Sequence, residues 1–130
     1  MRNVLPFLLA GLVLAVPGQA RERLAPEAEL ARALEGRVAG EAVDCVNLQR
    51  IHSTRIIQDT AILYDAGSII YVNRPRSGAE SLDRWDTLLT RTFGSRLCSI
   101  DTVRLLDSGS QIATGLVFLG DFVPYRKARR

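Results

Sequence analysis

The spacing of hydrophobic positions changes twice along the chain and divides it into three segments. Residues 4–16 form an almost uninterrupted apolar run. From residue 26 to residue 38, leucine and valine recur at every fourth position, which is the period of one helix face. After Gly40, apolar and polar residues alternate, as in a strand with one buried face. The pattern therefore predicts an apolar leader, one helix and then a β-rich domain.

The leader has the order of parts found in a secretory signal peptide. Residues 1–3 carry a positive charge, and Gly18 and Ala20 place small side chains at the positions that signal peptidase reads. The apolar run is about 13 residues long, shorter than the roughly 20 that cross a bilayer. We predict cleavage after Ala20, export to the periplasm or the medium, and no transmembrane segment in the mature protein. An uncleaved membrane anchor is the main alternative.

The helix predicted after the leader begins near Pro26, a residue that suits a first helical position. Leu30, Leu34 and Val38 make one narrow apolar stripe, and Gly40 is the expected stop. Because an apolar stripe needs a partner, we expect this helix to pack on the domain's own core; another chain is the alternative.

Short β-branched and aromatic runs separated by turn residues follow the helix. Six of them lie at 54–57, 60–64, 69–73, 87–93, 100–106 and 111–119. Asp65-Ala66-Gly67-Ser68 is a turn signal between two runs and predicts a hairpin. The expected fold class is mainly β (α+β): a small antiparallel barrel or sandwich of about six strands, preceded by one N-terminal helix.

Cleavage would leave about 110 residues, enough for one domain with a modest core. We divide the chain into a signal peptide at 1–20, an N-terminal extension and helix at 21–42, a disulfide-stapled β-domain at 43–125 and a basic C-terminal tail at 126–130.

The formal net charge of +3 comes from the end of the chain. Four basic residues lie there, and without them acidic side chains outnumber basic ones: Arg126, Lys127, Arg129 and Arg130. We therefore expect no nucleic-acid binding. The tail is a candidate contact for an anionic surface such as lipid headgroups or lipopolysaccharide, and a solvated terminus is the alternative.

Cys45 and Cys98 are the only cysteines. In an oxidising compartment such a pair forms a disulfide, and two separate buried thiols are the alternative. Neither cysteine has another cysteine or a histidine at ligand spacing, so we expect no metal site. No pattern in the chain predicts a cofactor.

The single histidine suggests an anion contact. If its segment is extended, Arg50 and His52 share a face, with Arg55 close by in sequence. A general base beside Ser53 and ordinary exposed polar side chains are the alternatives. A triad also needs an orienting acid and an oxyanion hole, and the chain has no Gly-x-Ser-x-Gly elbow. We therefore assign no catalytic residue.

Asp107-Ser108-Gly109 resembles the active-site turn of aspartic proteases. Leu119-Gly120 follows too soon to leave room for the flap and strands that this family places between its two elements. We expect a hairpin turn instead.

Acidic and aromatic residues in the second half of the chain suggest two further sites, which we do not favour. Glu80, Asp83, Asp86 and Asp101 lack calcium-loop spacing and predict solvated carboxylates. We expect the core, rather than a ligand-binding face, to contain Trp85, Tyr64 and Tyr71.

Six segments in a fixed order resemble a family of small exported proteobacterial proteins of unknown function. The segments are Asp44–Leu48, Ser53–Ile57, Thr60–Tyr64, Tyr71–Pro75, Leu97–Thr102 and Leu119–Pro124. The resemblance covers about residues 44–125. Many members carry a second cysteine pair, which would fall at 77–79 and 115–118 of this chain, where no cysteine occurs. The joint absence agrees with pairing of the two remaining cysteines, and the family implies no catalytic residues.

Together, these patterns favour a non-enzymatic binding or structural module of the cell envelope. Its expected partner is an envelope protein or an anionic surface. The alternatives are a small periplasmic hydrolase that uses His52 and an inhibitor or ligand carrier with an aromatic pocket.

Overall fold

The computed structural model describes residues 11–15, 18 and 23–129. Most of the predicted signal peptide, including its cleavage site, and Arg130 lie outside the described residues. The described residues form one α-helix, two 3-10 turns and ten strands, rather than about six strands. In chain order they are α1 Pro26–Ala33, β1 Arg37–Ala39, β2 Cys45–Asn47, η1 Leu48–Arg50, β3 Ser53–Ile57, β4 Ala61–Asp65, β5 Ile69–Asn73, η2 Ala79–Ser81, β6 Asp86–Thr90, β7 Arg96–Cys98, β8 Thr102–Asp107, β9 Ala113–Phe118 and β10 Phe122–Lys127.

The strands form three antiparallel sheets. The largest has the order β1-β10-β5-β4-β3, the second has the order β6-β8-β9, and β2 pairs with β7. The prediction of a mainly β protein with one leading helix is therefore confirmed. The barrel alternative is not, because β3 and β6 remain sheet edges and no ladder joins them among the described strands.

The main core lies between the sheets. The five-stranded sheet contributes Ile62, Tyr64 and Phe122, and the three-stranded sheet contributes Val103 and Leu105, all with 2% exposure or less. The ring of Tyr64 meets that of Phe122 edge to face at 5.6 Å. Since β2 and β7 also place side chains here, all three sheets share this interior.

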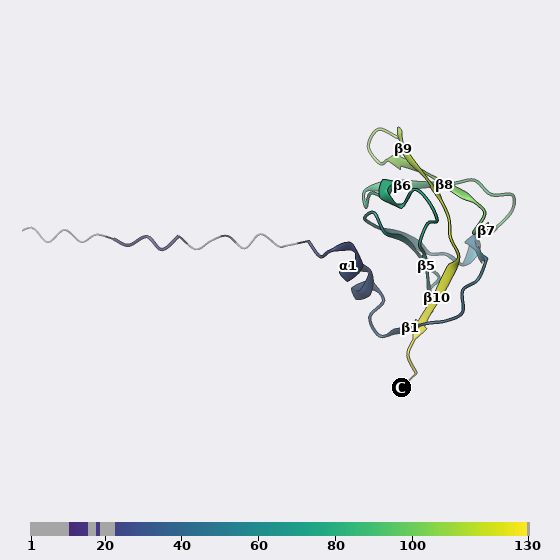
Figure 1. Ribbon diagram of the computed structural model, residues 1–130, viewed down its shortest axis with the longest axis horizontal. Coiled ribbons are helices and arrows are strands. Elements are labelled where there is room, and N and C mark those ends of the chain that lie inside the picture. Colours follow the sequence, from purple (N-terminus) through teal and green to yellow (C-terminus); the bar gives the residue numbers. More distant parts are fainter. Residues whose placement is uncertain (1–10, 16–17, 19–22, 130) are drawn as a thin grey trace, which may run out of the picture.

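The other side of the five-stranded sheet is covered by α1. Leu30 of the helix and Leu34, the cap residue just after it, pack with Ala61, Leu63 and Val72 in a second, smaller cluster. Neighbouring residues of β4 therefore point to different cores, which explains why its first four residues are all buried. In Figure 1, α1 lies beside β5 and β10. β9, a strand of the three-stranded sheet, is labelled at the opposite end of the body from the C-terminus.

The helix is shorter than its apolar spacing predicts. It ends at Ala33, and Gly36 then takes a positive φ of 76°, which turns the chain into β1. Val38 lies in β1 and is 60% exposed, so the prediction that it belongs to the helix stripe is wrong.

β10 is a strand that the hydrophobic pattern did not predict. It pairs with β5 over Phe122 to Arg126 and with β1 over Tyr125 to Lys127. Pro124 lies inside it, and proline within a run argues against a strand because it has no N–H to donate. Within the described ranges, no helix is long and apolar enough to span a membrane.

A buried amide joins β5 to the loop before β10. Asn73 is fully buried, and its side chain donates to the Gly120 carbonyl at 2.7 Å and accepts from the Gly120 N–H at 3.0 Å. A Cβ at residue 120 would collide with the carbonyl oxygen of Arg74, so the close approach requires glycine.

Candidate functional site

Two arginines converge on one carboxylate of α1. Glu29 accepts from Arg55 at 2.9 Å through Oε1 and contacts Arg84 at 3.4 Å through Oε2. The Glu29 side chain is only 13% exposed, whereas those of Arg84 and Arg55 are 24% and 56% exposed. The carboxylate therefore lies at the base of this group, with the guanidinium groups nearer the solvent.

Strand alternation and one loop place these arginines. On β3, Ser53, Arg55 and Ile57 point to the side that α1 covers, because side chains alternate along a strand. Arg84 follows η2, and its N–H donates to the Gln58 side chain at 3.1 Å. The loop containing Arg84 is thus held against the turn between β3 and β4.

A hollow of about 470 Å³ lies over this group. We call it the arginine hollow; its lining residues are Arg23, Leu24, Glu29, Arg32, Ala33, Arg55 and Arg84. Four guanidinium groups against one carboxylate leave an excess of positive charge. A guanidinium carries five N–H donors, so the contacts with Glu29 leave further donors for a ligand. The chemistry that matches is a carboxylate, phosphate or sulfate group.

A second hollow, of about 380 Å³, lies between the unpaired edges of β3 and β6. We call it the seam; it is lined by Thr54, Arg55, Ile56, Arg84, Asp86, Thr87 and Leu88. Arg55 and Arg84 line both hollows, so the arginine hollow and the seam adjoin one another.

Another ion pair fastens α1 on the side of the sheet toward β5. Arg74 donates to both carboxylate oxygens of Glu27, at 2.8 and 2.9 Å. The hydrogen bonds from Arg74 lower the pKa of Glu27, and the same pair raises the pKa of Arg74. Because one arginine here faces one carboxylate and leaves no excess of positive charge, we assign this pair a structural role.

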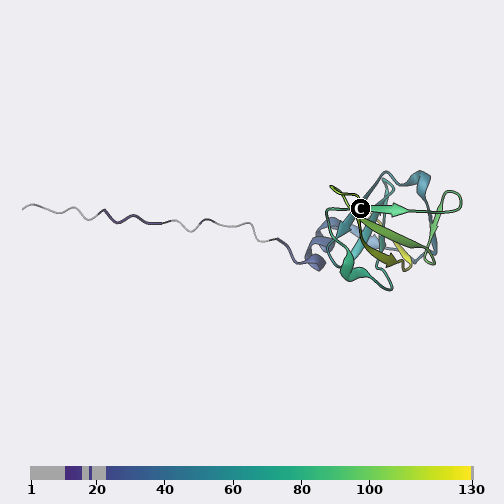
Figure 2. The same ribbon diagram turned by 90° about the horizontal axis from the view of Figure 1, so that it is seen from above.

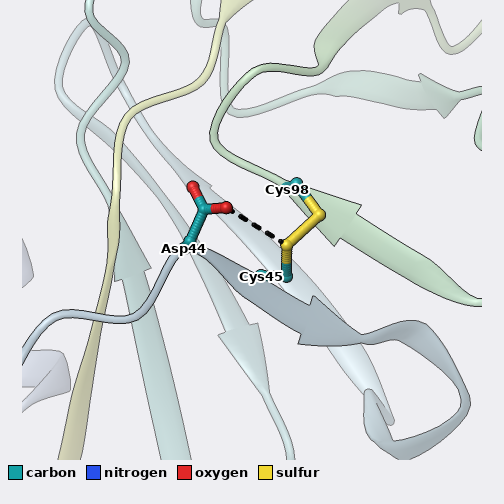
Figure 3. A group of neighbouring side chains, drawn as sticks. All are labelled: Asp44, Cys45 and Cys98. Atoms are coloured by element: carbon teal, nitrogen blue, oxygen red, sulfur yellow. Dashed lines mark hydrogen bonds between the residues drawn. A yellow bond between two sulfur atoms is a disulfide. The ribbon is translucent and has the colours of Figure 1, made fainter.

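The predicted disulfide is present. Cys45 and Cys98 are direct partners in the β2–β7 register, and their sulfur atoms are bonded at 2.04 Å. The Asp44 carboxylate faces the Cys45 sulfur at 3.5 Å (Figure 3) and also accepts from the Ser99 hydroxyl. A disulfide sulfur has no hydrogen to donate, so the 3.5 Å approach is a contact rather than a hydrogen bond. The Asp44 carboxylate and the sulfur atoms of Cys45 and Cys98 lie close enough together to hold a metal, but the disulfide removes the thiolates that would bind it.

The residues of the proposed anion contact lie apart. Arg55 is in the arginine hollow, Arg50 is exposed in η1, and His52 precedes β3 with its ring beside Gly67. By strand alternation, His52 and Arg55 point to opposite sides of the sheet. Among the described residues, no two of Arg50, His52 and Arg55 share a hydrogen bond, an ion pair or one of the hollows described above.

The predicted hairpin turn at Asp107 is confirmed, because it joins β8 to β9. Asp107 accepts from the Ser110 N–H at 2.7 Å, the Ser110 hydroxyl at 2.9 Å and the Gly109 N–H at 3.0 Å. These bonds lower the pKa of Asp107, those from Ser110 most of all. The carboxylate is thus used to hold its own turn.

Three of the other acidic residues accept hydrogen bonds within the fold. Asp83 accepts from the Trp85 N–H at 2.9 Å, Asp101 accepts from the Cys98 N–H at 2.7 Å, and Asp86 accepts from the Thr114 hydroxyl at 2.6 Å. Each carboxylate has a different partner, so these three form no common site in the described part of the chain.

The aromatic residues divide between the core and the surface. Tyr64 is buried and Tyr71 packs against the core, as predicted. Trp85 is 69% exposed, so its prediction as a core residue is wrong. It lies between two residues that line the seam, which places an exposed indole next to a polar hollow.

Part of the basic tail is strand rather than free terminus. Arg126 and Lys127 are exposed residues of β10, where they pair with Val38 and Arg37. Arg129 is exposed beyond the strand end. The last strand therefore presents this basic group at the β1 end of the large sheet.

Sequence reasoning missed most of the arginine hollow. Its residues come from the segment before α1, from α1 itself, from β3 and from the loop after η2, and only Arg55 was singled out from the sequence. The spacing along the chain carries no local signal, because tertiary packing alone brings residues 29, 55 and 84 together. Searches of known protein families, curated proteins and solved structures find no match for this chain.

Proposed function

We propose that this protein is an exported, non-enzymatic binding module of the cell envelope, and that it binds an anionic group in the arginine hollow. The observation that carries the proposal is the set of four arginines around the single carboxylate of Glu29. A purely structural ion pair needs one cation for each carboxylate. The additional guanidinium groups favour a ligand that brings its own negative charge.

The proposed location in the periplasm or the medium rests on the leader and the disulfide. Leu12, Val13 and Leu14 are at least 80% exposed, which suits a segment that is removed without loss of core. A disulfide between strands is stable in an oxidising compartment and is rare in the cytosol. The family resemblance over residues 44–125 remains a prediction.

The binding proposal fits the described geometry better than hydrolysis does. A hydrolase would need His52 within reach of a nucleophile and of an orienting acid. The His52 imidazole takes part in no hydrogen bond or ion pair described for residues 23–129, and its ring lies beside the turn at Gly67.

A citrate titration followed by NMR tests the proposal. We expect citrate to shift the side-chain N–H signals of Arg55 and Arg84 at millimolar concentrations, typical of a small anion on an exposed site. The double variant Arg55→Gln/Arg84→Gln should lose the response by about tenfold or more, since each charge-assisted bond is strong.

The matched control removes the same charge elsewhere. Arg126→Gln/Arg129→Gln also takes away two positive charges but leaves the hollow intact. It should bind citrate as the parent protein does. Equal loss in both double variants would show general charge attraction and would contradict a built site.

A further inference from the structure

We propose that the seam is a peptide-binding site: an extended acidic segment of a partner protein adds to β3 as a further strand, with carboxylates on Arg55 and Arg84. The inference rests on the proposed function, because it names the ligand class that the arginine hollow receives. Four observations lead to it.

The first is the state of the sheet edges. An open edge offers a row of unpaired N–H and C=O groups, and proteins cover or charge those that must not pair. The edge of β9 is covered: the Arg76 N–H donates to the Phe118 carbonyl at 2.9 Å, and the Phe118 N–H donates to the Ser77 carbonyl at 3.0 Å. A Cβ at Gly78 would collide with the Leu116 carbonyl, so this cover lies directly on the strand.

The edge of β1, at the far end of the large sheet, is short and charged. It has three residues, and the basic side chains of Arg37, Arg126 and Lys127 lie at its pairing with β10. The edges of β3 and β6 are different. Each has five residues, and neither has a strand partner on its outer side among the described residues.

The second observation is that the edges of β3 and β6 line the same hollow. Three consecutive residues of β3 and three of β6 line the seam. The Asp59 N–H donates to the Leu82 carbonyl at 2.9 Å where the β3–β4 turn meets the loop before β6. A ligand that forms hydrogen bonds with such strand edges must carry alternating donors and acceptors at strand spacing, as an extended peptide does. A lipid headgroup or a saccharide lacks that repeat.

The third observation is charge. The arginine hollow and the seam together contain four arginines against the carboxylates of Glu29 and Asp86. Arg55 belongs to β3 itself. A strand added to β3 therefore places every second side chain on the same face of the sheet as the Arg55 guanidinium group. Acidic side chains at those positions complement the surface.

The fourth observation is Trp85. Its side chain is 69% exposed, and the residues before and after it both line the seam. An exposed tryptophan beside arginine is typical of the residues that contribute most to protein interfaces. It is also the only tryptophan of the chain, so its fluorescence reports on this place alone.

The test uses the disulfide-intact protein and a capped seven-residue peptide of alternating valine and glutamate. We expect the peptide to change Trp85 fluorescence and to slow amide exchange in β3 by about tenfold or more at saturation, with no change in β1. Two further peptides have the same side chains, but N-methyl groups block the amides of all valines in one and of all glutamates in the other. At least one of them should bind about tenfold or more weakly, because it lacks the donors that pair with the edge.

The outcomes separate the inference from the proposed function. If both N-methyl peptides bind as tightly as the parent, strand addition is wrong, whereas citrate binding in the arginine hollow can still stand. If the valine–glutamine peptide binds as well as the valine–glutamate one, the acidic preference is wrong. Tighter binding to vesicles that contain phosphatidylglycerol than to the peptide, lost in Arg55→Gln/Arg84→Gln, would overturn the inference in favour of a lipid surface.

Discussion

The two sides of the five-stranded sheet are closed in different ways. One side packs against the other sheets, and the eleven buried residues of that core have at most 6% exposure. The other side is closed by the eight-residue α1, which contributes Leu30, and by Leu34 just after it. The helix forms three ion pairs, with Arg55 of β3, Arg74 just after β5 and Arg84 after η2. Figure 2 shows α1 at the margin of the body, where the chain enters it.

The difference teaches where stability and binding are located. Burial of apolar side chains between sheets supplies most of the stability, since exposed ion pairs contribute little. The helix side has the weaker packing and the excess of guanidinium groups. The proposed binding residues thus lie on the side of the sheet that contributes less to the stability of the fold. The following predictions test this division, from the largest expected effect to the smallest.

Loss of the disulfide should be the most damaging change on the inter-sheet side. Closing a loop of 53 residues stabilises the fold by about 4 kcal/mol on the chain-entropy model. We expect Cys45→Ala/Cys98→Ala to lower the free energy of unfolding in urea by about that amount. Reduction of the unmodified protein is the control and should have the same effect. A loss well below this would mean that β2 and β7 are held by packing alone.

Truncation of two neighbours on β4 compares the sides directly. Ile62, fully buried, faces the inter-sheet core, and Leu63, 5% exposed, faces α1. We expect Ile62→Ala to cost about 4 kcal/mol and Leu63→Ala about 2 kcal/mol, because the helix can shift to fill the space and the facing sheet cannot. Urea unfolding measures both. Equal costs would show that α1 is as rigidly packed as the sheets.

Removal of the buried amide tests the polar part of the inter-sheet side. Asn73→Ala leaves the Gly120 N–H and carbonyl without their partner, and we expect a loss of about 3 kcal/mol. Asn47→Ala is the matched control, since that exposed side chain accepts one bond from the Gln49 N–H. It should cost about 1 kcal/mol or less. Similar losses in thermal unfolding would contradict the role given to burial.

One tyrosine hydroxyl should be dispensable. The Tyr64 hydroxyl is buried and has no hydrogen-bond partner among the described residues, and burial raises the pKa of this phenol. We expect Tyr64→Phe to leave stability unchanged or to raise it by about 1 kcal/mol, because an unpaired polar atom leaves the core. Tyr71→Phe, at the paired position on β5, serves as the control. A clear loss in Tyr64→Phe would reveal a partner for the hydroxyl.

The helix side should depend on pH through Glu27. Its pKa is lowered from the ordinary 4.5, mainly by the hydrogen bond from Arg74, so the pair stabilises the fold above that value and is lost as pH falls through the lowered pKa. Unfolding of the parent and of Glu27→Gln between neutral pH and pH 3 should show a small difference that disappears in acid. A difference that persists at the lowest pH would show a role other than the charge pair.

The elements predicted correctly are those whose information is local. The β-branched and aromatic runs at 54–57, 60–64 and 69–73 predicted β3, β4 and β5, and the two cysteines predicted their own bond. β10 was missed because Pro124 interrupts its run, although β10 pairs with β1 on one side and with β5 on the other. The predicted helix was too long because Val38 continues the four-residue period, although the chain has already turned at Gly36.

The sequence by itself determined the start of the helix, the strands β3, β4 and β5, the turn at Asp107 and the pairing of Cys45 with Cys98, because each depends on neighbouring residues or on the only partner present. Only the tertiary structure decided that Glu29, Arg55 and Arg84 meet, that Trp85 is exposed and that β3 and β6 are left open. These features depend on which surfaces pack together. Packing joins residues that are distant in the chain, and no local pattern records it.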